Sequence, residues 1–334
     1  MCIALITTAH PQYPFILIDN RDEYLDRPTA PADFWPPPNG HVLGGHDLLK
    51  AERGTWLGIT RQGRVAVLTN FREESPGELD EAPRSRGAMV NAWLQQPPSS
   101  GQSAEQFVES LFSEEASIKG VGGFSLVCGQ LTKAENHSVA PLAVVSNRTP
   151  DATAATWIAG TPGETHGLSN SAYDNPWTKV RVGETLLKDA IEESITVGEG
   201  KRGLIRRLFG VLSVDTLPKR REGEHLETYL EQLRYSIFVP PIGADTPNTK
   251  PAAEIRAAAP NSDKVEVVGN NLEPGVMADS LPVYVYGTQK QTIILLDRFG
   301  QVTFVERTLF DERQRPIQIG DGDRTFEFEV EGWA

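Results

Sequence analysis

Cysteine is almost absent from this chain of 334 residues, which contains only Cys2 and Cys128. Two cysteines cannot build the disulfide framework of a small secreted domain, so we expect a reducing compartment. No apolar run approaches the roughly 20 residues of a membrane-spanning helix. The short run from Cys2 to Ile6 also lacks the basic region that precedes the core of a signal peptide. The sequence therefore predicts a cytoplasmic protein without a transmembrane segment.

Positive charge is scarce as well, because 32 Lys and Arg against 45 Asp and Glu give a formal net charge of −13. Nucleic-acid-binding surfaces are usually basic, so we expect no nucleic-acid partner. None of the six histidines has a partner at metal-site spacing, and no metal site is predicted. A serine-hydrolase elbow and a Walker-type phosphate loop are absent, and the one Gly-x-Gly-x-x-Gly string joins two predicted helices. We therefore predict no cofactor.

Hydrophobic periodicity predicts strands, helices, strands, helices and strands in that order. The expected strands are 3–8, 15–19, 55–60, 64–70, 122–129, 142–146, 156–159, 283–296, 302–308 and 325–330. The expected helices are one that begins at Ser85, then 106–112, 177–195, 202–212 and 225–235. Gly44-Gly45 is predicted as a turn, and residues 239–264, rich in Pro, Ala, Asn and Asp, as a mobile insertion. This order predicts a single layered α+β domain over 1–334, with two sheets sandwiched by helices.

Cys2 stands directly behind the initiator methionine, and removal of Met1 would leave it with a thiol and a free α-amine. Reference pKa values of about 7.7–8 for such an amine and about 8.5 for a thiol allow the amine to accept the thiol proton. The thiolate can then attack a carbonyl group. Position alone favours a simpler interpretation, a small apolar residue that opens a strand. Cys128, inside an apolar run, is predicted as a buried strand residue.

Four polar residues, Asn20-Arg21-Asp22-Glu23, follow the second expected strand directly. A turn at 10–14 predicts a hairpin, and its second strand returns to the neighbourhood of residue 2. An aspartate there can orient the amine of Cys2, and an arginine can bind substrate oxygens. The alternative is a solvated strand end that carries charge.

Two asparagines, Asn70 and Asn170, follow other expected strands. Acyl transfer from a thiolate needs neutral donors aimed at the developing oxyanion, and asparagine side chains serve this purpose. Asparagine at a strand end more often forms a turn. Both interpretations stay open on the residues alone.

With Cys2, the Asn-Arg-Asp-Glu tetrapeptide and Asn70 in place, the sequence resembles the transport and Golgi organization protein 2 family, known for its NRDE motif. Further segments resemble that family over most of the chain outside 239–264. These segments are 44–47, 54–60, 69–72, 85–87, 167–170, 286–288 and 304–307.

The resemblance implies the N-terminal-nucleophile hydrolase fold, a four-layer αββα sandwich shared with choloylglycine hydrolases and penicillin V acylases. In those enzymes an N-terminal cysteine works with an arginine, an aspartate and two asparagines. The resemblance places these at Cys2, Arg21, Asp22, Asn70 and Asn170. The hydrolases space their arginine and aspartate three apart, whereas the adjacent Arg21 and Asp22 point to opposite faces of a strand. Asn20 or Glu23 can therefore take the place of the arginine.

Two classes of function follow from the resemblance. The first is a cysteine-dependent hydrolase or acyltransferase for an amide or thioester of a small or lipid-like substrate. The second is a non-catalytic carrier of lipid or haem, with haem as cargo rather than cofactor. The family brings links with Golgi organisation, protein secretion, lipid homeostasis and haem trafficking, and with Golgi or mitochondrial membranes. The residues expected to bind the substrate are Asn20, Arg21, Glu23, Trp56, Arg72 and Arg86.

Overall fold

The computed structural model describes residues 2–70, 85–113, 121–133, 138–219, 229–243 and 285–333. The strands are β1 (Ile3–Thr7), β2 (Phe15–Tyr24), β3 (Thr29–Phe34), β4 (Val42–Asp47), β5 (Leu57–Thr60), β6 (Arg64–Asn70), β7 (Phe124–Gln130), β8 (Leu142–Ser146), β9 (Thr156–Ile158), β10 (Thr165–Leu168), β11 (Tyr286–Leu296), β12 (Gln301–Thr308) and β13 (Asp323–Glu329). The helices are α1 (Arg86–Leu94), α2 (Ala104–Leu111), α3 (Thr178–Val197) and α4 (Lys201–Leu212), with short 3₁₀ turns at Ala152–Ala154 and Glu231–Arg234.

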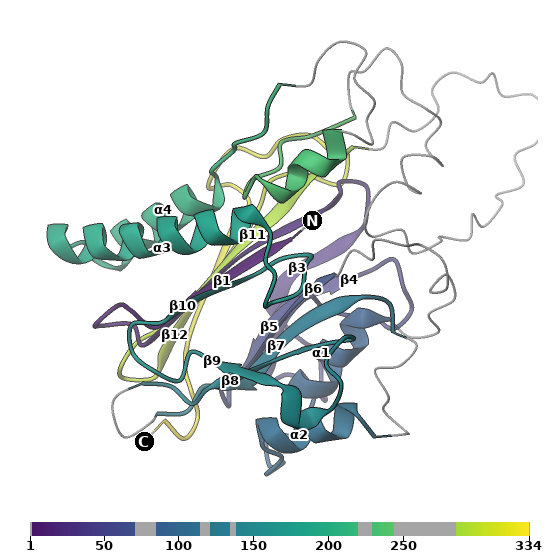
Figure 1. Ribbon diagram of the computed structural model, residues 1–334, viewed down its shortest axis with the longest axis vertical. Coiled ribbons are helices and arrows are strands. Elements are labelled where there is room, and N and C mark those ends of the chain that lie inside the picture. The colour runs from purple at the N-terminus through teal and green to yellow at the C-terminus, as the bar shows by residue number, and fades with distance from the viewer. Residues whose placement is uncertain are drawn as a thin grey trace, which may run out of the picture.

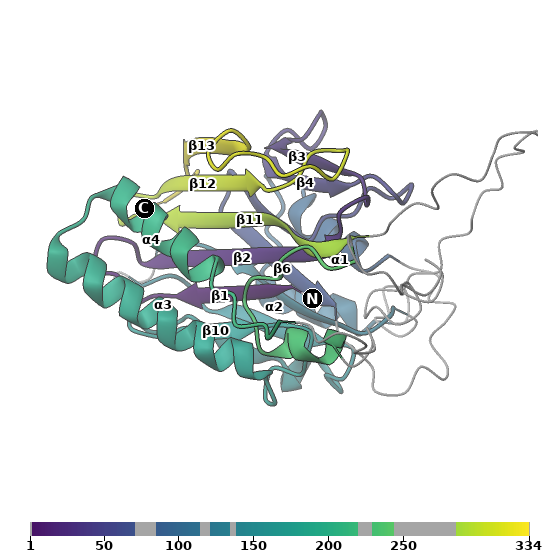
Figure 2. The same cartoon turned by 90° about the horizontal axis from the view of Figure 1, so that it is seen from above.

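Two antiparallel sheets face each other between two layers of helices (Figure 1). One sheet has the strand order β10-β1-β2-β11-β12-β13 and the other the order β3-β4-β5-β6-β7-β8-β9. Helices α3 and α4 cover the first sheet, and α1 and α2 cover the second (Figures 1 and 2). The order of the layers confirms the predicted αββα sandwich. Within the described ranges, no helix is both long enough and apolar enough to span a membrane.

Three hydrophobic clusters fill the spaces between these layers. Leu17 and Leu57 belong to the cluster between the two sheets. Trp93 belongs to the cluster under α1 and α2. Ile18 and Leu208 belong to the cluster under α3 and α4. Each sheet is therefore covered on both of its faces.

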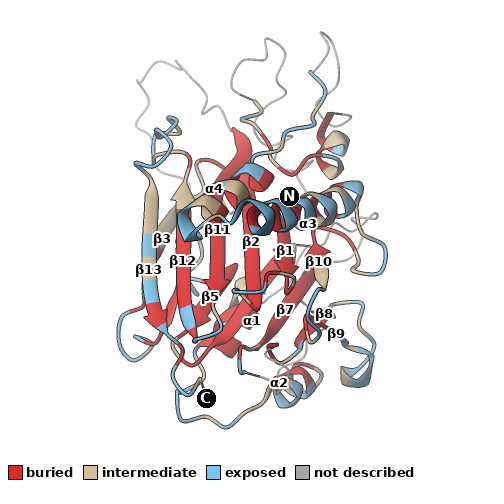
Figure 3. Ribbon diagram, turned by 90° about the vertical axis from the view of Figure 1, so that its left-hand side faces the viewer, coloured by how far each residue is buried: buried red, intermediate tan, exposed pale blue. Residues whose placement is uncertain are grey.

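Strand β2 lies inside this arrangement, and all ten of its residues are buried (Figure 3). Leu17 faces the other sheet, while its neighbours Ile16 and Ile18 face the helices. Because β2 has no solvent-facing side, its polar residues 19–23 need partners inside the protein.

The predicted N-terminal hairpin is confirmed, with Ile3 of β1 opposite Asn20 of β2. Strand β2 runs further than expected, to Tyr24, because β11 pairs with it along its other edge. The Asn-Arg-Asp-Glu tetrapeptide therefore lies within a strand and not after one.

The prediction of a turn at Gly44-Gly45 is wrong, because both residues lie in β4. A Cβ atom on Gly44 would lie 2.7 Å from the backbone oxygen of Leu57 in the neighbouring β5, so glycine permits this close approach. The expected strands also omit β3, β4 and β10. Strand β3 contains Pro31, and β10 has only four residues, so the periodic signal is weak in both.

The predicted helix 225–235 is described only from residue 229, and its last part forms the 3₁₀ turn Glu231–Arg234. The first residues of the predicted insertion belong to the core. Val239 is buried, and Ile242 pairs with β11. Residues 244–264 lie outside the described part of the chain.

We expect Gly44→Ala to destabilise the protein by about 1–3 kcal/mol, because the added methyl group would press against the backbone of β5. The matched control is Gly210→Ala on the exposed side of α4, where nothing lies within 4 Å of the new Cβ. There alanine is expected to stabilise the helix by up to about 1 kcal/mol. Urea unfolding followed by circular dichroism measures both changes. Wild-type stability of Gly44→Ala would contradict the close strand approach.

Candidate active site

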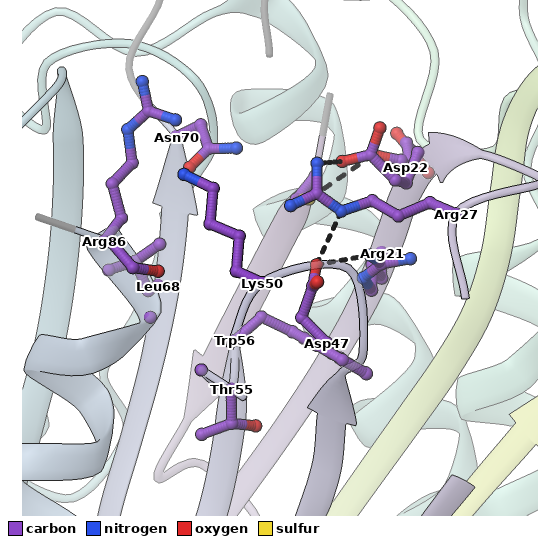
Figure 4. A pocket seen from close by; sticks show the side chains of 15 residues that line it. Arg21, Asp22, Arg27, Asp47, Lys50, Thr55, Trp56, Leu68, Asn70 and Arg86 are labelled. Atoms are coloured by element: carbon purple, nitrogen blue, oxygen red, sulfur yellow. Dashed lines mark hydrogen bonds and ion pairs between the residues drawn. The ribbon is translucent and has the colours of Figure 1, made fainter. Parts of the chain in front are cut away.

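A pocket lies at the end of the sandwich where β1 begins and where β2, β4 and β6 end (Figure 4). Its lining residues are Cys2, Arg21, Asp22, Glu23, Arg27, Asp47, Lys50, Gly54, Thr55, Trp56, Leu68, Asn70, Ser85, Arg86 and Gly87. The antiparallel pairing of β1 with β2 brings Cys2 and residues 21–23 to the same end. This confirms the prediction that the hairpin returns the tetrapeptide to residue 2.

Cys2 immediately precedes β1 and is 8% exposed. Its Sγ lies 3.8 Å from the backbone oxygen of Asp22, and its own carbonyl accepts a hydrogen bond of 2.7 Å from the Ser169 hydroxyl. Burial, with the nearby carboxylates of Asp22 and Asp19, raises the pKa of the Cys2 thiol to about 11. The thiol therefore keeps its proton at neutral pH, and a nucleophilic role requires a base.

Asp22 directs its side chain toward the helix layer. Its Oδ1 accepts a hydrogen bond of 2.7 Å from the Thr288 hydroxyl, and its Oδ2 lies 3.8 Å from Nζ of Lys179. Both side chains of this ion pair are fully buried. Burial raises the pKa of Asp22 and lowers that of Lys179, and each charge partly offsets the shift of the other. A charged pair is thus enclosed beside residue 2.

The sequence did not predict Lys179 as a residue of the site. It lies in the first turn of α3, on the same buried face as Gly183 and Leu187. These residues follow one another at intervals of four, the spacing of one face of a helix. A lysine within such a buried series is rare unless it is paired, and this was the signal that could have identified it.

Arg21 points into the space between the sheets, on the opposite face from Asp22. Its guanidinium lies 4.6 Å from the centroid of the Trp56 ring and 3.7 Å from the Asp47 carboxylate. Arg27 binds the same carboxylate at 2.5 Å and lies 3.6 Å from Glu23. Arg21, Glu23 and Trp56, proposed as substrate-binding residues, therefore do line the pocket.

Asn20 does not line the pocket, contrary to the prediction. Its Nδ2 donates hydrogen bonds to the carbonyls of Leu212 at 2.8 Å and Ile237 at 2.9 Å. Alternation along β2 places it on the helix side, so it ties the sheet to the end of α4. Of the two other arginines proposed, Arg86 lines the pocket, and Arg72 lies outside the described residues.

The two proposed asparagines differ in their placement. Asn70 ends β6 and lines the pocket (Figure 4). Asn170 is buried, and its Nδ2 donates a hydrogen bond of 2.5 Å to the backbone oxygen of Asn70. Asn70 is therefore the candidate donor to an oxyanion, and Asn170 holds the backbone that carries it.

Asp19 is a second buried carboxyl group that sequence reasoning missed. It lies on the same face of β2 as Arg21, opposite Ala4 of β1 and Thr292 of β11. Its Oδ2 is buried and has no hydrogen-bond partner among the described residues. Burial, and then the charge of Asp22, raises the pKa of Asp19 well above its usual range. Burial therefore makes Asp19 harder to ionise than an exposed aspartate.

Cys128 does not belong to the site. It lies in β7, within the cluster under α1 and α2, and burial raises its pKa to about 12. This confirms the prediction of a buried strand residue. Across the described residues, no group of three His, Cys, Asp or Glu side chains is arranged to hold a metal ion.

The layers and the pocket together define an αββα sandwich protein with a cysteine at the edge of its core, beside a buried Asp–Lys pair. Comparison with known proteins gives the family. The model of the family "Transport and Golgi organisation 2" matches residues 1–311. The human transport and Golgi organization protein 2 homolog is 31% identical over 330 residues, which cover 96% of this chain and 94% of that protein. The chain belongs to the Transport and Golgi organisation 2 family.

Two solved structures were also found by comparison. The N-acylethanolamine-hydrolyzing acid amidase ortholog of Caenorhabditis elegans is 12% identical, with a TM-score of 0.33 and coverage of 66% of this chain and 88% of that chain. Penicillin V acylase from Agrobacterium tumefaciens is 13% identical, with a TM-score of 0.35 and coverage of 98% and 86%. At these scores, the fold assignment rests on the layers and strand order of this chain itself.

We expect Lys179→Met to destabilise the protein by about 3–5 kcal/mol, because it leaves the fully buried Asp22 without its cationic partner. The double variant Asp22→Asn/Lys179→Met is expected to lose less than the sum of the two single changes. Lys188→Met, on the exposed side of α3, is the control for removal of one lysine. Equilibrium unfolding in urea measures all four. If the double variant loses the sum of the unfolding free energies that the two single variants lose, Asp22 and Lys179 are not coupled, and the prediction is wrong.

Asp19→Asn is expected to change the pH dependence of stability. The folded-state pKa of Asp19 is raised well above 3.8. Its stabilising contribution is therefore complete below the unfolded-state pKa and is lost as pH rises through the folded-state value. Relative to the wild type, Asp19→Asn should gain stability as the pH rises from 4 to 8. A difference that stays constant over this interval, measured by urea unfolding at each pH, would refute the raised pKa.

Proposed function

We propose that the protein is a cysteine-dependent hydrolase or acyltransferase that acts on an amide or thioester. The observation that carries this proposal is the position of Cys2, which lines a pocket with Asp22 and Asn70 at the start of a central strand. A nucleophile, a carboxylate and a neutral donor are the groups that acyl transfer needs.

The proposed reaction begins with removal of Met1, which creates a free α-amine on Cys2. Burial raises the pKa of the Cys2 thiol, so this amine must take its proton. The thiolate then attacks the carbonyl carbon of the substrate and forms the C–S bond, while the Asn70 amide donates a hydrogen bond to the oxyanion. The ammonium returns its proton to the leaving amine or thiol as the original C–N or C–S bond breaks. Water or another acceptor then releases the acyl group.

Asp22 and Lys179 support this step without reacting themselves. The Asp22 carboxylate can bind the α-ammonium that forms when the thiol loses its proton. Burial alone would favour the neutral carboxylic acid, and the Lys179 ammonium, 3.8 Å away, favours the charged form. Lys179 is therefore a positioning residue that maintains the charge of Asp22.

The alternative is a non-catalytic carrier that uses the same pocket. The raised pKa of Cys2 supports this alternative for a chain that retains Met1, because residue 2 then carries no free amine. Haem as its cargo finds little support, since the described lining contains no histidine. The names of the relatives refer to transport and Golgi organisation. A role of this chain in secretion, lipid homeostasis or haem trafficking, at the Golgi or at mitochondria, stays a prediction.

Intact-mass spectrometry of the purified protein, before and after incubation with a small acyl thioester, tests the proposal. We expect loss of Met1 and addition of one acyl group, which Cys2→Ala abolishes and Cys128→Ala leaves unchanged. A chain with one extra glycine before Cys2 keeps the thiol and removes its α-amine. Its acylation should be slower by about 10²–10⁴-fold, the usual contribution of a general base. Retention of Met1, or acylation that persists in Cys2→Ala, would overturn the proposal.

A further inference from the structure

We propose that Ser169 is a positioning residue that fixes the distance between Cys2, the candidate nucleophile, and Asn70, the candidate oxyanion donor. This inference rests on the proposed function for its catalytic consequence, whereas the contacts that carry it do not depend on any reaction. It assigns a role to a buried serine that the described lining of the pocket does not include.

The two groups that the reaction needs belong to different sheets. Cys2 immediately precedes β1 of the first sheet, and Asn70 ends β6 of the second. Ladder hydrogen bonds hold the strands together within each sheet, whereas two packed sheets meet through their side chains. The separation of the thiol from the Asn70 amide therefore depends on contacts that cross from one sheet to the other.

Ser169, which directly follows β10, makes such a contact with both sheets. Its hydroxyl donates a hydrogen bond of 2.7 Å to the carbonyl of Cys2, and the other acceptor near it, Oδ1 of Asn170, is more distant at 3.4 Å. The carbonyl of Ser169 accepts a hydrogen bond of 2.7 Å from the hydroxyl of Thr69, the residue before Asn70 in β6. One serine thus connects the residue that carries the thiol with the strand that carries the candidate donor.

This bridge is buried, and the next residue reinforces it. Ser169 and Thr69 are each 1% exposed. The Asn170 side chain donates its hydrogen bond of 2.5 Å to the carbonyl of Asn70, so two consecutive residues after β10 hold two consecutive residues at the end of β6. Buried hydrogen bonds are costly to leave unmade, so this network favours a single arrangement of its members.

Acyl transfer depends on such an arrangement. The substrate carbonyl must meet the thiolate and the oxyanion donor at the same time. Its carbon has to lie about 3–3.5 Å from the sulfur. Its oxygen has to lie about 2.7–3.1 Å from the donor. A displacement of about 1 Å can reduce the rate by about 10²-fold. Loss of the Ser169 hydroxyl should therefore lower the rate of acyl transfer more than the affinity for the substrate.

Single-turnover acylation of Cys2 by the butanoyl thioester of N-acetylcysteamine, followed by intact mass at a series of concentrations, tests the proposal. We expect Ser169→Ala to lower the maximal rate by about 10–100-fold and to change the half-saturating concentration by less than about twofold. The matched control is Ser125→Ala, at an equally buried serine of β7 whose hydroxyl lies 3.4 Å from the carbonyl of Ser171. It should keep the wild-type rate. A wild-type rate in Ser169→Ala, or equal losses in the two variants, would overturn the proposal.

Two variants of Thr69 test the bridge from the other sheet, and they serve also if Ser169→Ala does not fold. Thr69→Val removes the hydroxyl and keeps the shape of the side chain, so it should show the same selective loss of maximal rate. Thr69→Ser keeps the hydroxyl and should retain most of the rate. The double variant Ser169→Ala/Thr69→Val should lose little more than the larger single loss, because both changes break one bridge. Independent losses that multiply would contradict it.

Hydrogen–deuterium exchange separates this inference from the proposed function, because it reports the opening of backbone amides and needs no reaction at Cys2. We expect Ser169→Ala to speed exchange about tenfold at the start of β1 and the end of β6, relative to β12, and Ser125→Ala to leave β1 unchanged. That result in a protein whose wild type takes up no acyl group supports the bridge while the proposed function fails. Acylation of the wild type, with neither rate nor exchange altered in Ser169→Ala, supports the proposed function and overturns the inference.

Discussion

Burial of both faces of strand β2 is the constraint on which the site depends. A strand with helices on one side and a second sheet on the other has no exposed face, so every polar residue in it must be satisfied inside the protein. Alternation then divides the Asn-Arg-Asp-Glu tetrapeptide between two environments. Arg21 and Glu23 enter the pocket between the sheets, whereas the side chains of Asn20 and Asp22 meet the helix layer. One short motif therefore serves both packing and the candidate chemistry.

The buried pair of Asp22 and Lys179 has a cost in desolvation that an apolar pair would not have. The pair lies beside Cys2, and the Lys179 ammonium offsets part of the rise that burial causes in the pKa of Asp22. The same burial holds the Cys2 thiol in its protonated form. Reactivity at this site therefore requires a base close to the sulfur, and the α-amine of an N-terminal cysteine meets that requirement.

Charge is distributed unevenly between the pocket and the rest of the chain. The chain as a whole is acidic, while the pocket lining combines four cationic side chains with the three acidic ones of Asp22, Glu23 and Asp47. The αββα fold does not select a substrate, and it is the lining of the pocket that must do so.

The sequence by itself determined the elements whose signals are local. The turn at 10–14 and the apolar runs beside it predict the hairpin that places Cys2 near residues 20–23, and periodicity predicts the helix that begins at Ser85. Only the tertiary structure decided which side chains meet at the pocket. Asn20 is excluded because alternation along β2 turns its side chain toward the helices. Lys179 reaches Asp22 behind the pocket because α3 packs on β1 and β10. The physical reason is that strand ends, faces and burial depend on partners far along the chain, which local patterns do not contain.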